Sequence, residues 1–113
     1  MSVELAVKLF TAVPKKHNCA QAVADGCGLP DLAAGMASCG GGKAPEGMCG
    51  ALYAALFFAS AENKKKMTEE FRYAAGSTLC REIKTVTGYP CCECVRTAAS
   101  LVEKYHRYPI KNF

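Results

Sequence analysis

The chain has 113 residues, of which 50% are hydrophobic and 21% are charged, so it is not a disordered protein, and its length predicts one domain. Its 14 Lys and Arg residues outnumber its 10 Asp and Glu residues, but they are scattered, which argues against the basic face of a nucleic-acid-binding protein. Eight cysteines are the unusual feature, because a chain of this length can bury a core without disulfide bonds.

Glycine and proline separate the hydrophobic runs and β-branched residues are few, a pattern typical of an all-α protein. We expect one compact bundle of about five to six helices. The first should cover residues 3–12. The second should cover residues 14–25, with Pro14 near its start and Gly26 as its C-terminal cap. A short helix over residues 32–37 should follow, and then a glycine-rich loop over residues 39–47.

The fourth helix, over residues 48–61, is apolar on every side and should be the buried central helix. A solvated link over residues 63–66 should separate it from a fifth helix that begins at Thr68 as the N-cap and ends at Gly88. The core face of this fifth helix should hold Phe71, Ala75, Leu79, Ile83 and Val86. Pro90 should open the last helix, over residues 91–106, with Val95, Ala98, Ala99 and Val102 in the core, before an irregular tail over residues 107–113.

Cys91 and Cys94 form a C-x-x-C pair in the first turn of the last predicted helix. Unpaired backbone N–H groups and the positive end of the helix dipole stabilise a thiolate at such a position. We therefore expect lowered thiol pKa values and reactivity at neutral pH, although the same geometry also suits a metal-bound thiolate. The β-α-β context of a thioredoxin-like motif is missing.

The other cysteines fall in three kinds of position. Cys49 should lie in the first turn of the central helix, where Gly50 leaves room for another segment or a cofactor to approach the sulfur. Cys19 and Cys80 should lie inside helices, where a free cysteine is often only a packing residue. His17 is either solvated or a proton partner of Cys19. No role is assigned to the remaining cysteines, Cys27, Cys39 and Cys92.

The first residues lack the basic region and the long apolar stretch of a secretory signal. The longest apolar run, residues 48–59, is too short to span a bilayer. We therefore expect a cytoplasmic protein without a membrane span. In a reducing compartment, clustered cysteines are more often metal ligands or catalytic groups than structural disulfides.

Four cysteines and their neighbours resemble a known family over residues 18–105. The matching segments are residues 18–23 around Cys19, the run Gly40-Gly41-Gly42 followed by Cys49-Gly50-Ala51, residues 79–83 around Cys80, and Cys91 placed four residues before Val95. This pattern resembles the C_GCAxxG_C_C family, whose motif is C…C-G-A-x-x-G…C…C. Two positions depart from the motif, because Ala54 replaces its second glycine and Cys39 stands where a phenylalanine often precedes the glycine loop.

The resemblance implies a redox role for a single cysteine-rich helical domain spanning residues 1–113, with Cys19, Cys49, Cys80 and Cys91 as its site. Members often occur beside transport genes, and some relatives are fused to electron-transfer modules. The redox partner, the substrate and the oligomeric state stay open. So does the partner of Cys91, because Cys92 and Cys94 follow it closely.

Three functions are compatible with the sequence. In the first, a thiol–disulfide oxidoreductase or electron carrier that needs no cofactor, Cys91 or Cys49 attacks as a thiolate and Cys94 or a facing cysteine resolves the mixed disulfide. In the second, an electron carrier, Cys19, Cys49, Cys80 and Cys91 bind an iron–sulfur cluster, for which four thiolates are the usual ligands. In the third, a structural or partner-binding domain, the cysteines are packing residues or hold a zinc ion.

Overall fold

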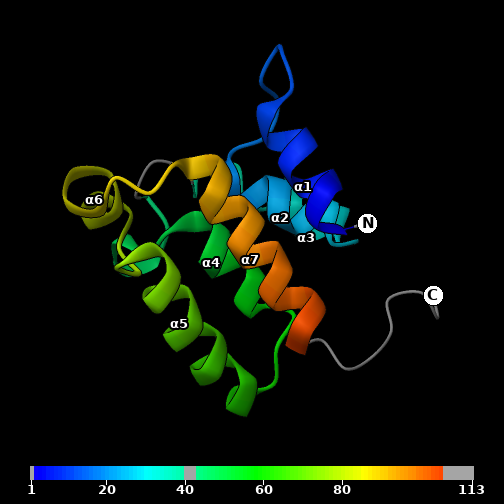
Figure 1. Ribbon diagram of the computed structural model, residues 1–113. Helices are drawn as coiled ribbons and strands as arrows, with labels where there is room; N and C mark the ends of the chain where they lie inside the picture. Colours follow the sequence, from blue (N-terminus) through cyan, green and yellow to red (C-terminus); the bar gives the residue numbers. More distant parts are fainter. Residues whose placement is uncertain (1, 40–42, 106–113) are drawn as a thin grey trace.

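The computed structural model describes residues 2–39 and 43–105. Within these residues the chain is all-α, as the sequence predicts, with seven α-helices, one short 3₁₀-helix, one π-helical segment and no β-strand (Figure 1). One hydrophobic core draws residues from helices at both ends of the chain, including Ala6, Phe71 and Val102. None of the described helices is long and apolar enough to cross a membrane.

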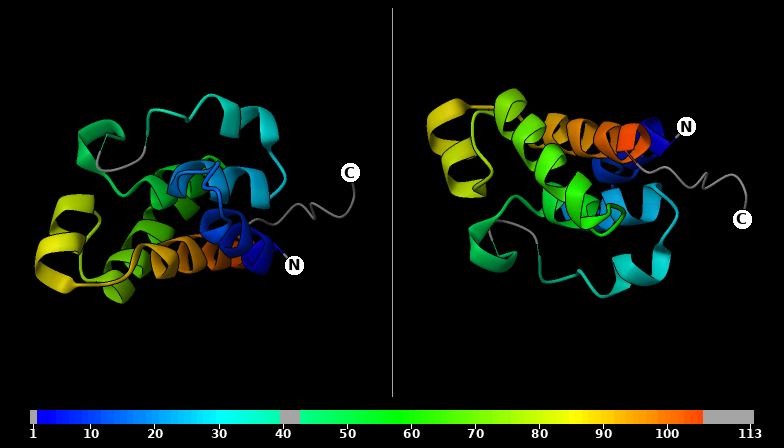
Figure 2. Two further views of the ribbon diagram at one scale, coloured as in Figure 1. Left: turned by 90° about the horizontal axis from the view of Figure 1, so that it is seen from above. Right: turned by 90° about the horizontal axis from the view of Figure 1, so that it is seen from below.

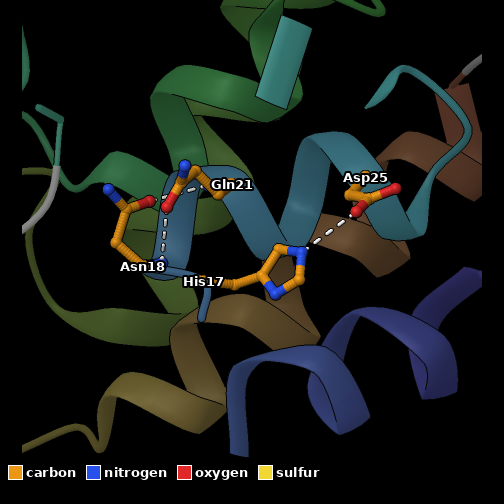
Figure 3. A network of polar contacts seen from close by, with 4 residues as sticks. All are labelled: His17, Asn18, Gln21 and Asp25. Atoms are coloured by element: carbon orange, nitrogen blue, oxygen red, sulfur yellow. Dashed lines mark hydrogen bonds and ion pairs between the residues drawn. The ribbon is translucent and has the colours of Figure 1, made fainter. Parts of the chain in front are cut away.

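The first helix, α1 (Ser2–Thr11), matches its prediction, but α2 (Cys19–Gly26) begins five residues later than predicted. The cause is a capping box at Asn18. Its side-chain oxygen accepts a hydrogen bond from the backbone N–H of Gln21 at 2.7 Å, and the Gln21 side chain accepts one from the backbone N–H of Asn18 at 3.0 Å (Figure 3). Such a reciprocal cap satisfies two N–H groups at the helix start, so the helix begins here and not at Pro14.

Gly26 is the last residue of α2 and not its cap, which is Cys27. A side chain cannot be added at Gly26, because an ideal Cβ would lie 2.6 Å from the Cα of Ala6 in α1. The missing Cβ therefore lets α1 cross α2 in direct backbone contact, with Ala6 fully buried.

Two short helices connect the first pair to the centre of the fold. Helix α3 (Pro30–Ala34) begins at Pro30, two residues before its predicted start, because the fixed φ of proline suits the first helical position. Residues 40–42 of the predicted glycine-rich loop lie outside the described residues, and the loop ends in a 3₁₀-helix (Pro45–Gly47). Helix α4 (Gly50–Leu56) is shorter than predicted, but five of its seven residues are buried, so it is the central helix as expected.

The fifth helix, α5 (Ala61–Ala75), includes the residues predicted as a solvated link. Ser60 is its N-cap, because the Ser60 side-chain oxygen accepts a hydrogen bond from the backbone N–H of Asn63 at 3.2 Å. The prediction of Thr68 as the N-cap is wrong. Thr68 lies inside the helix and its hydroxyl donates to the carbonyl oxygen of Lys64 at 2.7 Å.

The predicted helix over residues 68–88 is broken at Gly76, which has φ 90° and ends α5 in the left-handed conformation that favours glycine. The chain then forms a short helix, α6 (Cys80–Glu82), and a π-helical segment (Ile83–Thr87) that ends at Gly88. This break shifts the helical register. Leu79 and Val86 are consequently 36% and 77% exposed, contrary to their predicted core positions, whereas Phe71, Ala75 and Ile83 are buried.

The last helix, α7 (Cys91–Tyr105), contacts α1, α2, α4 and α5, and all four of its predicted core residues are buried. His106, its predicted end, and the tail lie outside the described residues. Figure 1 shows α7 in front of α4, with α5 on one side and α1 and α2 on the other. In Figure 2, α3 and the connection to α4 lie on the side of α2 and α4 that faces away from α7.

The contact at Gly26 gives a first prediction. We expect Gly26→Ala to lower the free energy of unfolding by about 1–3 kcal/mol, because the new methyl group would overlap the Ala6 backbone, which cannot rotate away. Gly35→Ala is the matched control, since the nearest atom to its ideal Cβ, the carbonyl oxygen of Leu32, is 3.5 Å away. Urea unfolding measures both variants, and an unchanged midpoint for Gly26→Ala would contradict the described α1–α2 contact.

Candidate functional site

Five of the eight cysteines surround one small cavity of about 20 Å³. Its wall is apolar and is completed by Ile83 and the side chain of Lys84. The cysteines are Cys19, Cys49, Cys80, Cys91 and Cys94. The four cysteines selected by their resemblance to the C_GCAxxG_C_C motif therefore line one cavity, and Cys94 joins them. We call these five residues the cysteine cluster.

The cysteine cluster forms where several helices begin. Cys19, Cys80 and Cys91 are the first residues of α2, α6 and α7, and Cys49 is the N-cap of α4. The sequence predicted this position for Cys91 and Cys49 only. The prediction that Cys19 and Cys80 lie inside helices is wrong. The cap at Asn18 makes Cys19 the first residue of α2, and the break at Gly76 allows a new helix to begin at Cys80.

Hydrogen bonds hold the segment before Cys49 against the segment before Cys80. The backbone N–H of Cys49 donates to the carbonyl oxygen of Thr78 at 2.7 Å, and Met48 and Leu79 form an isolated antiparallel β-bridge. The Ser77 hydroxyl accepts from the N–H of Leu79 at 3.0 Å. These bonds fix the backbone on which Cys49 and Cys80 sit.

Gly50 brings α4 against the start of α2. An ideal Cβ at this position would lie 2.9 Å from the Cys19 sulfur and 2.7 Å from the carbonyl oxygen of Cys39. The sequence predicted that Gly50 leaves room for another segment, and the structure confirms it. Any larger residue would overlap the Cys19 sulfur and the Cys39 carbonyl oxygen.

Three thiols of the cysteine cluster form a hydrogen-bonded row. The Cys49 side chain shares hydrogen bonds with both Cys19 and Cys94. Cys49 and Cys94 are only 4% and 3% exposed, whereas Cys19 is half-buried. The hydrogen-bond partner of Cys94 is thus Cys49, although Cys91 precedes it in the C-x-x-C motif and lines the same cavity.

The expectation of lowered thiol pKa values at Cys49 and Cys91 is wrong. At Cys49 the hydrogen bond with Cys19 lowers the pKa, but the hydrogen bond with Cys94 and burial together outweigh it and raise the pKa to about 12. Burial also raises the pKa of Cys91, against the opposing charge of Lys84. The hydrogen bond to Cys49, followed by burial, raises the pKa of Cys19. Crowding in an apolar cavity therefore overrides the helix dipole.

A groove of about 170 Å³ covers the outer side of the cysteine cluster. Cys19, Cys80 and Cys91 face it, and its remaining lining is Phe10, Lys15, Asn18 and Lys84. The Lys15 ammonium lies 3.7 Å from the centre of the Phe10 ring. Sequence reasoning missed both lysines. The spacing of four residues between Cys80 and Lys84 was the available signal, because such residues share a face of a helix.

The remaining cysteines lie apart from this cavity. Cys27 is buried, and burial, followed by the charge of Glu103, raises its pKa to about 12. Cys39 lines a separate cavity of about 200 Å³ beside Tyr53 and Phe57. Cys92 is half-buried and faces neither the cavity nor the groove.

His17, considered above as a proton partner of Cys19, has a different partner. Its Nε2 atom lies 3.0 Å from a carboxylate oxygen of Asp25, one helix length away along α2 (Figure 3). This contact fastens the segment before α2 to the far end of that helix. It therefore supports the position of Cys19 through the backbone.

The donor set of the cysteine cluster suits an iron–sulfur centre, because four or five sulfurs converge on one apolar cavity. The cavity is too small for an iron–sulfur cluster with the side chains in their present positions, since its volume of about 20 Å³ holds roughly one water molecule. The cysteines would have to move apart to admit iron and sulfide ions. Among residues 2–39 and 43–105, no three His, Cys, Asp or Glu side chains are arranged to hold a metal ion.

Comparison of the chain with protein-family models, curated protein sequences and solved structures gave no match.

The buried thiol of Cys27 gives a second prediction, because no other cysteine contributes to its raised pKa. In the unfolded chain this thiol titrates near its ordinary value of about 8.5. Its contribution to stability is complete below that pH and is lost as the pH rises towards 12, where the folded thiol ionises. Over this interval the free energy of unfolding should fall by about 1.4 kcal/mol per pH unit for this one group.

Urea unfolding of the reduced protein at several pH values between about 9 and 11 measures this slope. We expect Cys27→Ala to make the fall of the free energy of unfolding with pH less steep by about 1.4 kcal/mol per pH unit, the contribution of one titrating group. Gly35→Ala is the control, because it removes no titratable group, and it should keep the slope of the unchanged protein. Equal slopes for the two variants would show that the Cys27 thiol ionises as readily in the folded chain as in the unfolded chain.

Proposed function

We propose that the protein is a redox-active protein that uses the cysteine cluster for thiol–disulfide exchange. The observation that carries this proposal is the hydrogen-bonded contact of the Cys49 thiol with both Cys19 and Cys94, in a cavity that Cys80 and Cys91 also line. A disulfide requires two sulfurs that can approach to bonding distance, and neighbouring thiols in contact meet this need.

The proposed reaction begins at Cys91, which is half-buried and faces the groove, whereas Cys49 is almost fully buried. The Cys91 thiolate attacks a disulfide RS–SR, forms a mixed disulfide and releases RS⁻, which takes up the proton that Cys91 lost. A thiolate from a second cysteine of the cluster then attacks the Cys91 sulfur and releases the second RS⁻, which is also protonated. Two protein thiols and RS–SR thereby become one protein disulfide and two RSH.

Lys84 is the group that helps Cys91 ionise. Its positive charge opposes the effect of burial on the Cys91 pKa, and Lys15 acts in the same direction more weakly. No comparable cation contributes to the pKa of Cys49. A thiolate therefore forms more readily at the groove than in the interior, which favours Cys91 for the attacking role and leaves the resolving role to another cysteine of the cluster.

The iron–sulfur alternative is a second candidate, and its support is the convergence of Cys19, Cys49, Cys80 and Cys91. A bound cluster would supply one-electron transfer, and these four residues would hold it. Helix starts at the cysteines would favour the negative charge of the bound group. The small volume of the cavity places this candidate second, because the side chains must first separate.

The deciding experiment is to purify the protein without oxygen, measure its iron and zinc content and visible spectrum, and titrate the thiols with a disulfide. We expect a colourless protein that loses thiols in pairs, with peptide mapping showing disulfides among the five residues of the cysteine cluster. Five thiols form at most two disulfides and leave one thiol over, so Cys19→Ser and Cys80→Ser should each change which of the remaining four cysteines pair. Cys92→Ser is the control and should keep the same disulfides as the unchanged chain.

Other outcomes would support the competing functions. A brown protein with stoichiometric iron and absorption near ~400 nm would establish the iron–sulfur candidate instead. Disulfide formation that is the same with and without Cys19 and Cys80 would show that these two residues serve only in packing.

A further inference from the structure

We infer that the groove over Cys91 binds small sulfur compounds that carry a carboxylate, so that the disulfide exchanged by the cysteine cluster is a small anionic one. This inference rests on the proposed function, because it names the substrate class of that reaction. The groove places two lysines, one aromatic ring and three cysteines around the same space.

The charged side chains that line the groove are all positive. Lys15 and Lys84 line it, both are exposed, and none of the described residues lining it is acidic. The lysines come from different parts of the fold, because Lys15 precedes α2 and Lys84 lies in the π-helical segment. Helices α2 and α7 also begin at this groove, at Cys19 and Cys91, and the start of a helix carries partial positive charge.

Both lysines are close enough to Cys91 for their charges to act on its thiol. A substrate whose sulfur contacts Cys91 would therefore hold a carboxylate two or three bonds further on within reach of an ammonium group. The polar side chain of Asn18 is already used, because its amide donates to the carbonyl oxygens of Met36 and Ala37. The lysines are thus the groups of the groove that remain to recognise a ligand.

The size of the groove limits the substrate. Its volume of about 170 Å³ is below the roughly 300–1,000 Å³ of pockets that hold drug-sized ligands. The Phe10 ring supplies an apolar surface for a short carbon chain, and the Lys15 ammonium sits over that ring at 3.7 Å. A short chain with a sulfur at one end and a carboxylate at the other matches this arrangement.

The reaction with such a substrate is the same two-step thiol–disulfide exchange. Cys91 and a second cysteine of the cluster give two electrons and two protons to the anionic disulfide, which leaves as two thiols. Cys19 and Cys80 are the candidates for the second cysteine, because both face the groove beside Cys91 and line the same inner cavity. The reverse reaction oxidises two anionic thiols and regenerates the reduced cluster.

The test compares three disulfides of similar size with different charges. These are 3,3′-dithiodipropionate, which is anionic, bis(2-hydroxyethyl) disulfide, which is neutral, and cystamine, which is cationic. The rate of thiol loss from the reduced protein is measured with each and divided by the rate for free 2-mercaptoethanol, which corrects for intrinsic reactivity. We expect the anionic disulfide to be preferred over the neutral one by about tenfold, and cystamine to be the slowest.

Variants assign this preference to the groove. Lys84→Gln and Lys15→Gln should each reduce the ratio of anionic to neutral rates, and the double variant should bring it close to one, as should added salt. Lys65→Gln removes the same charge from an exposed position on α5 and is the matched control, which should keep the ratio. Lys84→Gln should slow the reaction with the neutral disulfide as well, because Cys91 then ionises less readily, but this loss affects all three disulfides and cancels in the ratio. Lys65→Gln should leave the rate with the neutral disulfide unchanged.

The outcomes separate the inference from the proposed function. Equal corrected rates for all three disulfides, or a preference for cystamine, would overturn the anionic substrate class while leaving thiol exchange intact. An anionic preference that survives the double lysine variant would show that another surface provides it. Failure of all three disulfides to oxidise the reduced thiols would overturn the proposed function itself.

Discussion

The close approach of the Gly50 backbone to the Cys19 sulfur is the contact on which the cysteine cluster depends. A Cβ at Gly50 would come within 2.9 Å of this sulfur, so the start of α2 can rest on the start of α4 only because the side chain is missing. Cys19 at the start of α2 and Cys49 at the start of α4 therefore line the same cavity. Since α7 packs on α2 and on α4, its first turn adds Cys91 and Cys94. The cysteine cluster therefore depends on close contact between helix backbones, which a residue without a side chain makes possible at Gly50.

The sequence was sufficient to predict the all-α class and to select the residues that the cavity brings together. Cys19, Cys49, Cys80 and Cys91 were chosen by their likeness to a family motif, and Cys94 by its spacing from Cys91. Helix starts were predicted less well, because Pro14 favours an earlier start of α2 than the capping box of Asn18 and Gln21 allows. That pattern is readable in a sequence as a polar cap followed three residues later by Gln. The bend at Gly76 was missed because an unbroken hydrophobic repeat was read across it.

The thiol pKa values could not be predicted from sequence, because they depend on how many sulfurs share one cavity. A single cysteine at a helix start gains stabilisation for its thiolate. When several cysteines are in contact, ionisation of one thiol makes ionisation of its neighbours less favourable, because negative charges repel strongly in a low-dielectric space. The result is a neutral interior at Cys49 and a groove where Lys15 and Lys84 supply positive charge. Lys84 belongs to a segment bounded by Gly76 and Gly88, so its placement depends on a bend that local propensity alone did not reveal.

The neutrality of the buried thiols has a consequence for the energetics of electron flow. Cys49 holds its proton up to a pH of about 12, so a disulfide that includes it cannot be reduced to a stable pair of thiolates at ordinary pH. In the proposed reaction, each electron that the cysteine cluster takes up is accompanied by a proton, and each electron that it gives up is accompanied by the release of one. The midpoint potential of the pair then falls by about 59 mV for each rise of one pH unit. In the proposed reaction, proton transfer to and from Cys49 is therefore as necessary as the exchange between the sulfur atoms.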